Sequence, residues 1–459
     1  MEIIDGMQEH LRPGDHISIE ITHPSSSLVS SIKEKMEDFS SSISIALVPE
    51  NIAKENRRAY IPEKLSIGPF HRGNRAFKNM EGQKWRYAFA LLNRKPNLEL
   101  ESTIDKCMKA VHELEHRAKR CYSDIKLPGN EFEEMLLVDG SFIIELLIKY
   151  SNKSLRRRGD PIFGTPGKLF DLRCDMVLLE NQIPMFVLQR LFQVVRAPEQ
   201  CEQSLSDLLY RFFRNMIPGE PRNLREKFND EAHHFLDLIH NCLIPTVSYP
   251  IGTKPQDETE TIPSPAGKGI KPARELKRAG VKFKCRANNA SLLDIDFKNG
   301  MLQIPPLVLN QSTERLFKNL VALEQTRCVN LPCVSSYVRL IHCLISSEKD
   351  EKLLEEVGIV TNLLDKDVRV SGLFRDICEG VTVEEDFHYE GLCDQVEEYC
   401  EAKKRKWKKL KRKRKNRSPG AVASLGSGSS SVLVVAVLIL VFTALGAMFS
   451  ALSFFLHRN

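Results

Sequence analysis

The sequence lacks the motifs that carry nucleotide, kinase and serine-hydrolase chemistry. Gly167-Lys168 is followed by Leu169, and Ile162 stands where the first glycine of a phosphate loop is required, so the Walker pattern fails at two positions. Neither a G-x-S-x-G elbow nor the set of protein-kinase motifs occurs. These absences disfavour a P-loop nucleotide hydrolase, an α/β-hydrolase and a protein kinase.

Paired cysteines and an N-terminal apolar leader are missing as well. The chain has 12 cysteines, but no two form a C-x-x-C pair and their spacing is irregular. Scattered thiols of this kind are typical of reduced cytosolic proteins rather than of disulfide-stabilised secreted domains. The first 20 residues contain acids and no apolar core, so a cleaved signal peptide is not expected. Both observations favour a body that faces the cytosol.

Acidic residues are absent beyond residue 402, where the chain becomes strongly basic. Thirteen of the 66 basic residues and none of the 60 acidic ones lie there, which leaves the first 402 residues with a net charge of −7. The run 403–417 holds twelve of these bases. We expect it to contact a membrane surface through Lys403, Lys404, Arg405, Lys406, Trp407, Lys408, Lys409, Lys411, Arg412, Lys413, Arg414, Lys415 and Arg417. Because basicity is local, we expect no nucleic-acid partner; nuclear import or nucleic-acid association remains an alternative.

Charged residues are also missing from Val432–Leu456, a stretch of 25 residues. About 20 apolar residues suffice to cross a bilayer core, so this stretch predicts a transmembrane helix, preceded by a Gly/Ser-rich tether at 418–431. Basic residues beside a span stay on the cytoplasmic side. The layout predicts a tail-anchored, single-pass protein of the plasma membrane or another endomembrane, with a cytosolic N-terminal body. The basic run would bind anionic lipid headgroups, and Gly446 and Ser450 would allow a homodimer through the span.

Helical periodicity dominates the body, which we place at 45–402 after an N-terminal extension at 1–44. Apolar residues recur at helical spacing in the extension, at Leu28, Ile32 and Met36, and in the body at Phe77–Leu91, Phe235–Leu243, Thr313–Gln325 and Ser335–Ile345. The segment 248–271 is rich in Pro, Gly, Thr and charge, and is predicted to be a disordered loop or linker. The predicted fold is mainly α, a helical globular cytosolic domain with a small β-hairpin or sheet and one C-terminal transmembrane helix.

One segment departs from helical periodicity. Leu293, Ile295 and Phe297 alternate with charged residues, Asn299-Gly300 suits a type I′ turn, and alternation resumes afterwards at Leu302. This pattern predicts a β-hairpin. Because a lone hairpin is marginally stable in water, we expect Val281–Lys284 to add a third strand.

Seven blocks, in this order along the chain, carry a family resemblance. They are YIPEKLSIGPFHRG (60–73), MEGQKWRY (80–87), MLLVDGSFIIELL (135–147), VLLENQIPMFVLQRLF (177–192), ARELKRAGVKFK (273–284), the hairpin (291–307) and NLVALEQ (319–325). The chain resembles the plant domain-of-unknown-function 247 family over roughly 45–456. The resemblance implies an uncharacterised plant membrane protein, and some grass members are implicated as pollen-side determinants of self-incompatibility. It supplies no catalytic residue.

The string His112-Glu113-Leu114-Glu115-His116 fits H-E-x-x-H, in which two histidines one helical turn apart hold zinc and the glutamate activates water. Here the flanks are Arg117, Lys119 and Arg120, which is typical of a solvated helix face with ion pairs at helical spacing. No third ligand is evident. We interpret the string as a surface helix, with a metal-dependent hydrolase as the enzymatic alternative.

Two other polar groups have structural interpretations. His233, Asp237 and His240 could share one helix face and hold a metal, but a polar stripe is what an amphipathic helix requires anyway. Glu180, Asn181 and Gln182 precede Pro184, which removes a backbone donor; their side chains are suited to satisfying the freed backbone groups.

Taken together, the patterns predict a non-enzymatic membrane protein whose α-rich cytosolic domain binds another, unidentified protein in signalling or recognition. We expect no catalytic residues, no cofactor and no metal.

Overall fold

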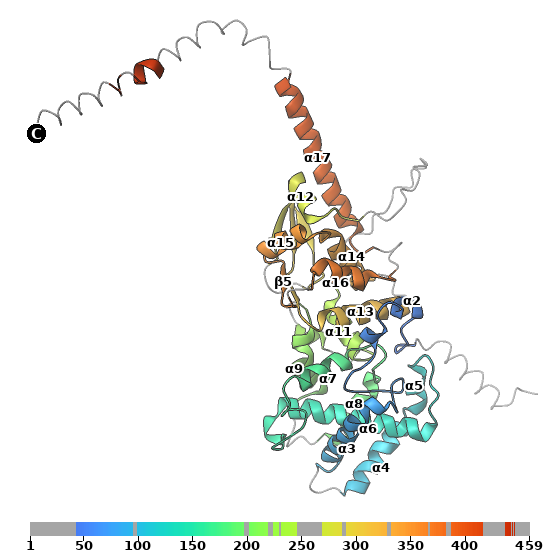
Figure 1. The fold of residues 1–459 in the computed structure, drawn as a ribbon. Coiled ribbons are helices and arrows are strands. Elements are labelled where there is room, and N and C mark those ends of the chain that lie inside the picture. Colours follow the sequence, from blue (N-terminus) through green and yellow to red (C-terminus); the bar gives the residue numbers. More distant parts are fainter. Residues whose placement is uncertain are drawn as a thin grey trace, which may run out of the picture.

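The computed structural model describes most of the chain. The described residues are 43–94, 99–196, 202–218, 224–228, 231–245, 269–286, 291–327, 332–365, 368–381, 387–415, 437–441, 443 and 445. The fold is mainly helical with two small sheets, as the periodicity predicts. Figure 1 shows a body in which α3, α4 and α6 lie at one end and α17 leaves from the other.

The helices of the described residues are α2 (Glu50–Ala53), α3 (Lys78–Leu92), α4 (Leu100–His112), α5 (Glu115–Arg120), α6 (Gly129–Ser151), α7 (Lys168–Met176), α8 (Met185–Val195), α9 (Leu205–Phe213), α10 (Leu224–Lys227), α11 (Phe235–Leu243), α12 (Ala273–Ala279), α13 (Thr313–Arg327), α14 (Cys333–Leu344), α15 (Glu348–Glu356), α16 (Val370–Cys378) and α17 (Glu390–Lys415). The 3₁₀ turns are η1 (Arg57–Tyr60), η2 (Arg75–Phe77), η3 (Lys153–Leu155) and η4 (Arg214–Met216). The strands are β1 (Lys282–Cys285), β2 (Asp296–Lys298), β3 (Met301–Ile304), β4 (Leu307–Leu309) and β5 (Val360–Asn362).

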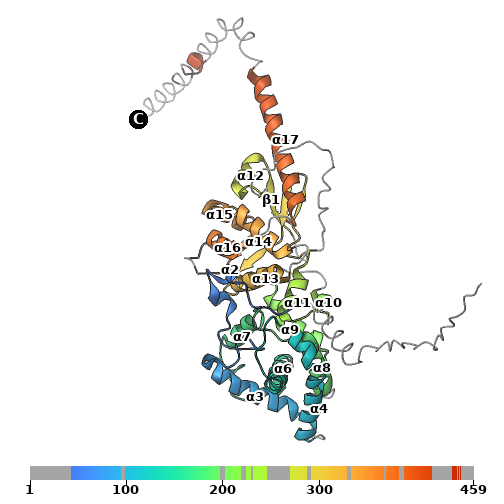
Figure 2. The same ribbon diagram turned by 90° about the vertical axis from the view of Figure 1, so that its right-hand side faces the viewer.

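Helix α6 is the centre of the N-terminal part. Its side chains are buried without interruption from Met135 to Lys149, and α3, α4, α8 and α9 pack around it (Figure 2). A helix that is apolar on all sides must be covered on all sides, which explains this arrangement. Helix α13 connects this part to the rest, because it packs against α11 and η1 as well as α14 and α16. The buried apolar residues form one continuous cluster from Ile45 to Cys400.

The predicted hairpin is confirmed. Strands β2 and β3 are antiparallel with Phe297 opposite Leu302, and Asn299 and Gly300 form the turn with φ angles of 54° and 76°. The predicted third strand is confirmed as β1, which pairs parallel to β3 and gives the order β1-β3-β2. A second sheet, in which β4 and β5 pair in parallel, was not predicted.

The predicted C-terminal transmembrane helix is wrong for this structure. In the part of the chain that the structure describes, no helix is both long and apolar enough to cross a bilayer. Of Val432–Leu456, the structure describes Val437–Val441, Thr443 and Leu445.

Three other predicted segments lie wholly or mostly outside the described residues. They are the short amphipathic helix of the extension 1–44, the tether 418–431, and the loop 248–271 apart from its last three residues. Gly446 and Ser450 also lie outside.

Candidate functional site

Helix α17 has two halves with different surroundings. In the first half, Leu392, Cys393, Val396 and Cys400 are buried, at intervals that place them on one face. This face packs on α12 and β2. The burial ends at Lys403, so the boundary predicted between residues 402 and 403 falls inside a continuous helix.

Two glycines in the sheet region let α17 dock closely. The ring of Tyr399 covers Gly300, where a β-carbon would overlap its hydroxyl and ring carbons, and it meets Phe297 edge to face with centroids 5.6 Å apart. The ammonium of Lys403 donates to the carbonyl of Gly280 at 3.2 Å. Lys403 is thus part of the docking contact, which distinguishes it from the cations that follow.

The second half of α17 extends away from the body (Figure 2). Every side chain from Lys404 to Lys413 is exposed, and within the described residues none of these cations forms an ion pair with a carboxylate. Trp407 and Leu410 are 64% and 62% exposed on the same helix, and the ammonium of Lys411 lies 5.5 Å from the Trp407 ring. We call residues 404–413 the free half of α17.

The remaining residues of the predicted surface contact are placed only in part. Arg414 and Lys415 belong to α17, and Arg417 lies outside the described residues.

The H-E-x-x-H string does not lie on one helix. Helix α4 ends at His112 and α5 begins at Glu115, so the two histidines are not one turn apart on a continuous helix. His112 is exposed and its Nδ1 lies 2.7 Å from Glu133 Oε1, a contact that raises the pKa of His112. Glu113 pairs with Arg190 at 3.2 Å. Among the described residues, no group of three potential metal ligands is present.

The other histidine candidate for a metal is also dispersed. The carboxylate of Asp237 accepts the amide of His233 at 2.7 Å and pairs with Arg327. His240 Nε2 lies 2.8 Å from Glu324 Oε1. The side chains of Asp237 and His240 are thus each engaged by a separate partner.

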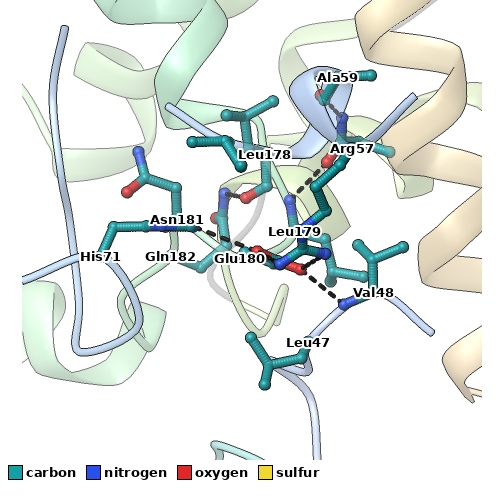
Figure 3. A network of polar contacts seen from close by, with 12 residues as sticks. Leu47, Val48, Arg57, Ala59, His71, Leu178, Leu179, Glu180, Asn181 and Gln182 are labelled. Carbon is teal, nitrogen blue, oxygen red and sulfur yellow. Dashed lines mark hydrogen bonds and ion pairs between the residues drawn. The ribbon is translucent and has the colours of Figure 1, made fainter. Parts of the chain in front are cut away.

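The carboxylate of Glu180 is buried at the centre of a polar network (Figure 3). Arg57 donates to both of its oxygens, at 2.7 and 2.8 Å, and the amide of Val48 donates at 2.9 Å. His71 Nε2 lies 3.3 Å away, within ion-pair distance but without hydrogen-bond geometry. Burial alone would raise the pKa of Glu180, but His71, the Val48 amide and Arg57 together hold it below its ordinary value.

The neighbouring side chains satisfy backbone groups, as the sequence predicts. Asn181 accepts the amide of Ile67 and donates to the carbonyls of Leu65 and Asp175. Gln182 donates to the carbonyls of Met176 and Leu178 and accepts the amide of Phe235. The turn before Pro184 is thus held by its own side chains.

Comparison with known proteins gives the context of these contacts. A family model described as "Plant protein of unknown function", DUF247, matches residues 45–441. The chain belongs to the DUF247 family. The UPF0481 protein At3g47200 of Arabidopsis thaliana is 30% identical over 355 residues, which cover 74% of each chain. The putative UPF0481 protein At3g02645, also of Arabidopsis thaliana, is 23% identical over 425 residues, which cover 74% of this chain and 78% of that one. No solved structure matches the chain.

The sequence blocks that resemble the DUF247 family bond to one another through buried polar residues. Lys84 of the second block pairs with Asp139 of the third, and Asp139 accepts the amide of Gly68 of the first at 2.9 Å. Asn319 of the last block accepts the amide of Leu179 of the fourth at 2.9 Å. Together with the bond from the Ile67 amide to Asn181, these contacts join five of the seven DUF247 blocks into one connected scaffold.

Sequence reasoning missed the role of His234. Its Nε2–H donates to the carbonyl of Ser44 at 2.8 Å, and its Nδ1 accepts the amide of Asp237 at the start of α11. The side chain is buried, and burial, helped by the charge of Arg327, lowers its pKa to about 3. His234 is thus a neutral helix cap in this DUF247 chain; its position directly before the apolar run was the available signal.

Proposed function

We propose that this chain is a non-enzymatic interaction protein whose α-rich body is held against an anionic lipid surface by the free half of α17. The observation that carries the proposal is the exposure of Trp407 and Leu410 within an unpaired basic stretch. Basic helices that also present Trp and Leu bind in the headgroup region of anionic bilayers. A purely electrostatic nucleic-acid arm has no need of exposed apolar side chains.

Charge and geometry support the same proposal. Each Lys or Arg near an anionic cytosolic leaflet contributes about 1 kcal/mol, so the cations of the free half supply enough attraction for stable contact. The body beneath carries a net negative charge and would not compete for the same surface. The docking of Tyr399 and Lys403 on the sheet orients the body relative to the helix.

The body is proposed to bind a partner protein rather than to catalyse a reaction. Its buried charged groups are engaged in structural contacts, such as Glu180 with Arg57 and His240 with Glu324. Both histidine candidates for a metal have separate partners, which supports a binding role.

Liposome co-sedimentation of the full-length chain tests the lipid contact. A variant with Lys408, Lys409, Lys411 and Arg412 changed to Gln is expected to lose at least about 100-fold in affinity for phosphatidylserine-containing vesicles. The matched control changes four exposed body lysines, Lys109, Lys126, Lys298 and Lys352, to Gln and is expected to retain affinity.

The double variant Trp407→Ala, Leu410→Ala separates lipid from nucleic acid. On vesicles it is expected to bind at least about tenfold more weakly, because two apolar side chains are lost from the interface. Unchanged vesicle binding by this variant, together with tight binding of the wild type to duplex DNA, would favour the nucleic-acid alternative and contradict the proposal.

A further inference from the structure

A basic pocket of about 600 Å³ lies beside the end of α6, in the part of the body remote from α17. Its walls come from the C-terminal end of α6, from η3, and from α9, η4 and α10. The volume is within the range of small-molecule sites. Among the described residues, five cations line it, Lys153, Arg156, Arg211, Arg214 and Arg225, against one carboxylate, that of Asp207.

The carboxylate neutralises only one of these cations. Asp207 accepts from Arg225 Nε at 3.0 Å and Nη2 at 2.5 Å, and this hydrogen bonding holds the pKa of Asp207 below its ordinary value. It also accepts from the hydroxyl of Ser204 at 2.9 Å. The remaining four cations leave the pocket with a formal charge of +4 when the Arg225–Asp207 pair is counted as neutral.

Two of the other arginines are held in place by neutral groups. Arg156 donates to the carbonyls of Lys149 and Tyr150 at 2.8 and 2.9 Å, at the C-terminal end of α6, and stacks on Phe163. Arg211 donates to the hydroxyl of Ser151 at 3.3 Å. Neutral acceptors orient a guanidinium without cancelling its charge, so these side chains are fixed yet remain available to an anion.

A further arginine lies behind the pocket wall. The guanidinium of Arg173 stacks 4.6 Å from the ring centroids of Tyr150 and Phe212, and its Nε and Nη2 are buried without a hydrogen-bond acceptor. A partly buried cation next to the wall adds to the positive potential in the pocket, because its low-dielectric surroundings screen it less than water does.

The aromatic rings of the pocket are already in use. Tyr150 carries Arg173 on its ring and meets Phe212 edge to face, and Tyr210 meets Phe228 edge to face. A nucleotide base would find little free ring surface to stack on. The phosphate groups of a ligand, not a base, are what this pocket is suited to recognise.

We infer that this pocket binds a small organic polyphosphate through Arg156, Arg211, Arg214 and Lys153. Arginine suits this ligand because its planar fork of donors matches phosphate oxygens. The ligand also removes a strain on the body, since four like charges facing one space repel each other until an anion enters. The site is independent of the lipid contact of α17.

Isothermal titration calorimetry of the full-length chain, at physiological salt, tests the inference with inositol hexakisphosphate, ATP and pyrophosphate as probes. The titrations use the background with Lys408, Lys409, Lys411 and Arg412 changed to Gln, which halves the number of cations in the free half of α17 and so weakens polyphosphate binding there. We expect inositol hexakisphosphate to bind most tightly. The affinity for ATP should be no higher than its phosphate charge alone would give, because its base adds no contact. Tighter binding of ATP than of inositol hexakisphosphate would contradict recognition through phosphates alone, and absence of binding by all three probes at 1 mM, roughly the weak limit for a specific site, would overturn the inference.

Pocket variants then locate the bound probe. Arg211→Gln and Arg214→Gln are each expected to weaken binding about tenfold. Arg190→Gln and Arg375→Gln, exposed arginines outside the pocket, are the matched controls and are expected to bind like the parent. Equal effects of pocket and control variants would overturn the assignment to this site.

A substitution expected to strengthen binding provides a further test, because misfolding of a variant would weaken binding and could not mimic that result. Asp207→Asn removes the carboxylate that lines the described part of the pocket but keeps an acceptor for Ser204, so we expect it to tighten binding about threefold or more. Circular dichroism checks that each variant retains its helices. Weaker binding by a folded Asp207→Asn variant would contradict an anion site.

Discussion

Lys84 Nζ and Asp139 Oδ1 lie 2.7 Å apart in the interior, with side-chain exposures of 2% and 1%. Glu81 also approaches this ammonium at 2.7 Å from a half-buried position. The pair joins α3 to the central helix α6. Removing one partner of a buried ion pair leaves the other charge without compensation, which costs about 3–5 kcal/mol.

We therefore expect Lys84→Met to lower the free energy of unfolding by about 3–5 kcal/mol in urea denaturation. The matched control is Lys109→Met, which breaks the exposed i, i+4 pair with Asp105 and should change stability by no more than about 0.5 kcal/mol. Equal effects of the two variants would show that the interior pair has no special role.

Gly300 is expected to be essential for the docking of α17. Gly300→Ala combines a left-handed backbone, at about 1–2 kcal/mol, with a clash against the Tyr399 ring that adds about 1–3 kcal/mol. Faster hydrogen exchange at residues 392–400 would report the loosened helix.

Gly73→Ala serves as the control for Gly300→Ala, because Gly73 has a φ of 81° but nothing within 4 Å of an added β-carbon. The free energy of unfolding of Gly73→Ala should fall only by the cost of placing alanine at a positive φ. In a Tyr399→Ala background, the cost of Gly300→Ala should fall to that of the control. A cost that stays the same without Tyr399 would contradict the predicted clash.

His234 is expected to make the body sensitive to acid. Its pKa is about 3 in the folded chain, against about 6.5 when unfolded, so below pH 6.5 the unfolded chain binds a proton that the folded chain does not. Stability contributed by neutral His234 is complete above pH 6.5 and is lost as pH falls from there toward 3, by up to about 1.4 kcal/mol per pH unit.

Urea denaturation at pH 7, 6 and 5 measures this slope. In His234→Asn the new side chain can still accept the Asp237 amide but does not titrate, so the slope between pH 7 and 5 should flatten by about 1 kcal/mol per pH unit relative to the wild type. His112→Asn is a control of opposite sign: the Glu133 contact raises the pKa of His112, so losing it should make the slope slightly steeper, not flatter. An unchanged slope in His234→Asn would mean that other groups cause the acid sensitivity.

The H-E-x-x-H string is expected to bind no stoichiometric zinc. His112 and His116 lie at the end of one helix and within another, and Glu113 is paired with Arg190. Dialysed protein should contain well under one zinc per chain by elemental analysis. Zinc near one per chain that is lost in both His112→Ala and His116→Ala would revive the hydrolase alternative.

Local patterns predicted local structure well. The alternation around Asn299-Gly300 found a hairpin because its strands are adjacent in the sequence. Helical spacing placed Lys84 on the same face as Met80 and Leu91, and the structure buries all three. The presence of Pro184 likewise predicted that Asn181 and Gln182 hydrogen-bond to backbone groups of the turn.

Contacts between distant segments were not predictable from one sequence. Strand β4 pairs with β5 about 50 residues later, and no periodicity encodes that partner. Glu180 was recognised as polar in an apolar run, but its partner Arg57 lies 123 residues earlier. The basic run was found from its charge, whereas its continuity with a docked helix depends on Tyr399 meeting Gly300.

Residues 44–67 are held in place by hydrogen bonds from segments much later in the chain, and this has a consequence for folding during synthesis. The carbonyl of Ala59 accepts a hydrogen bond from Asn319, 260 residues further along, and the amide of Val48 donates to Glu180, which is also synthesised later. At a translation rate of about 5–20 residues per second, Asn319 emerges about 10–50 s after Ala59. During that interval Ile45, Val48 and Ile52 lack their native cover, so the first part of the body to leave the ribosome is among the last to be fixed, and chaperones have time to act on it.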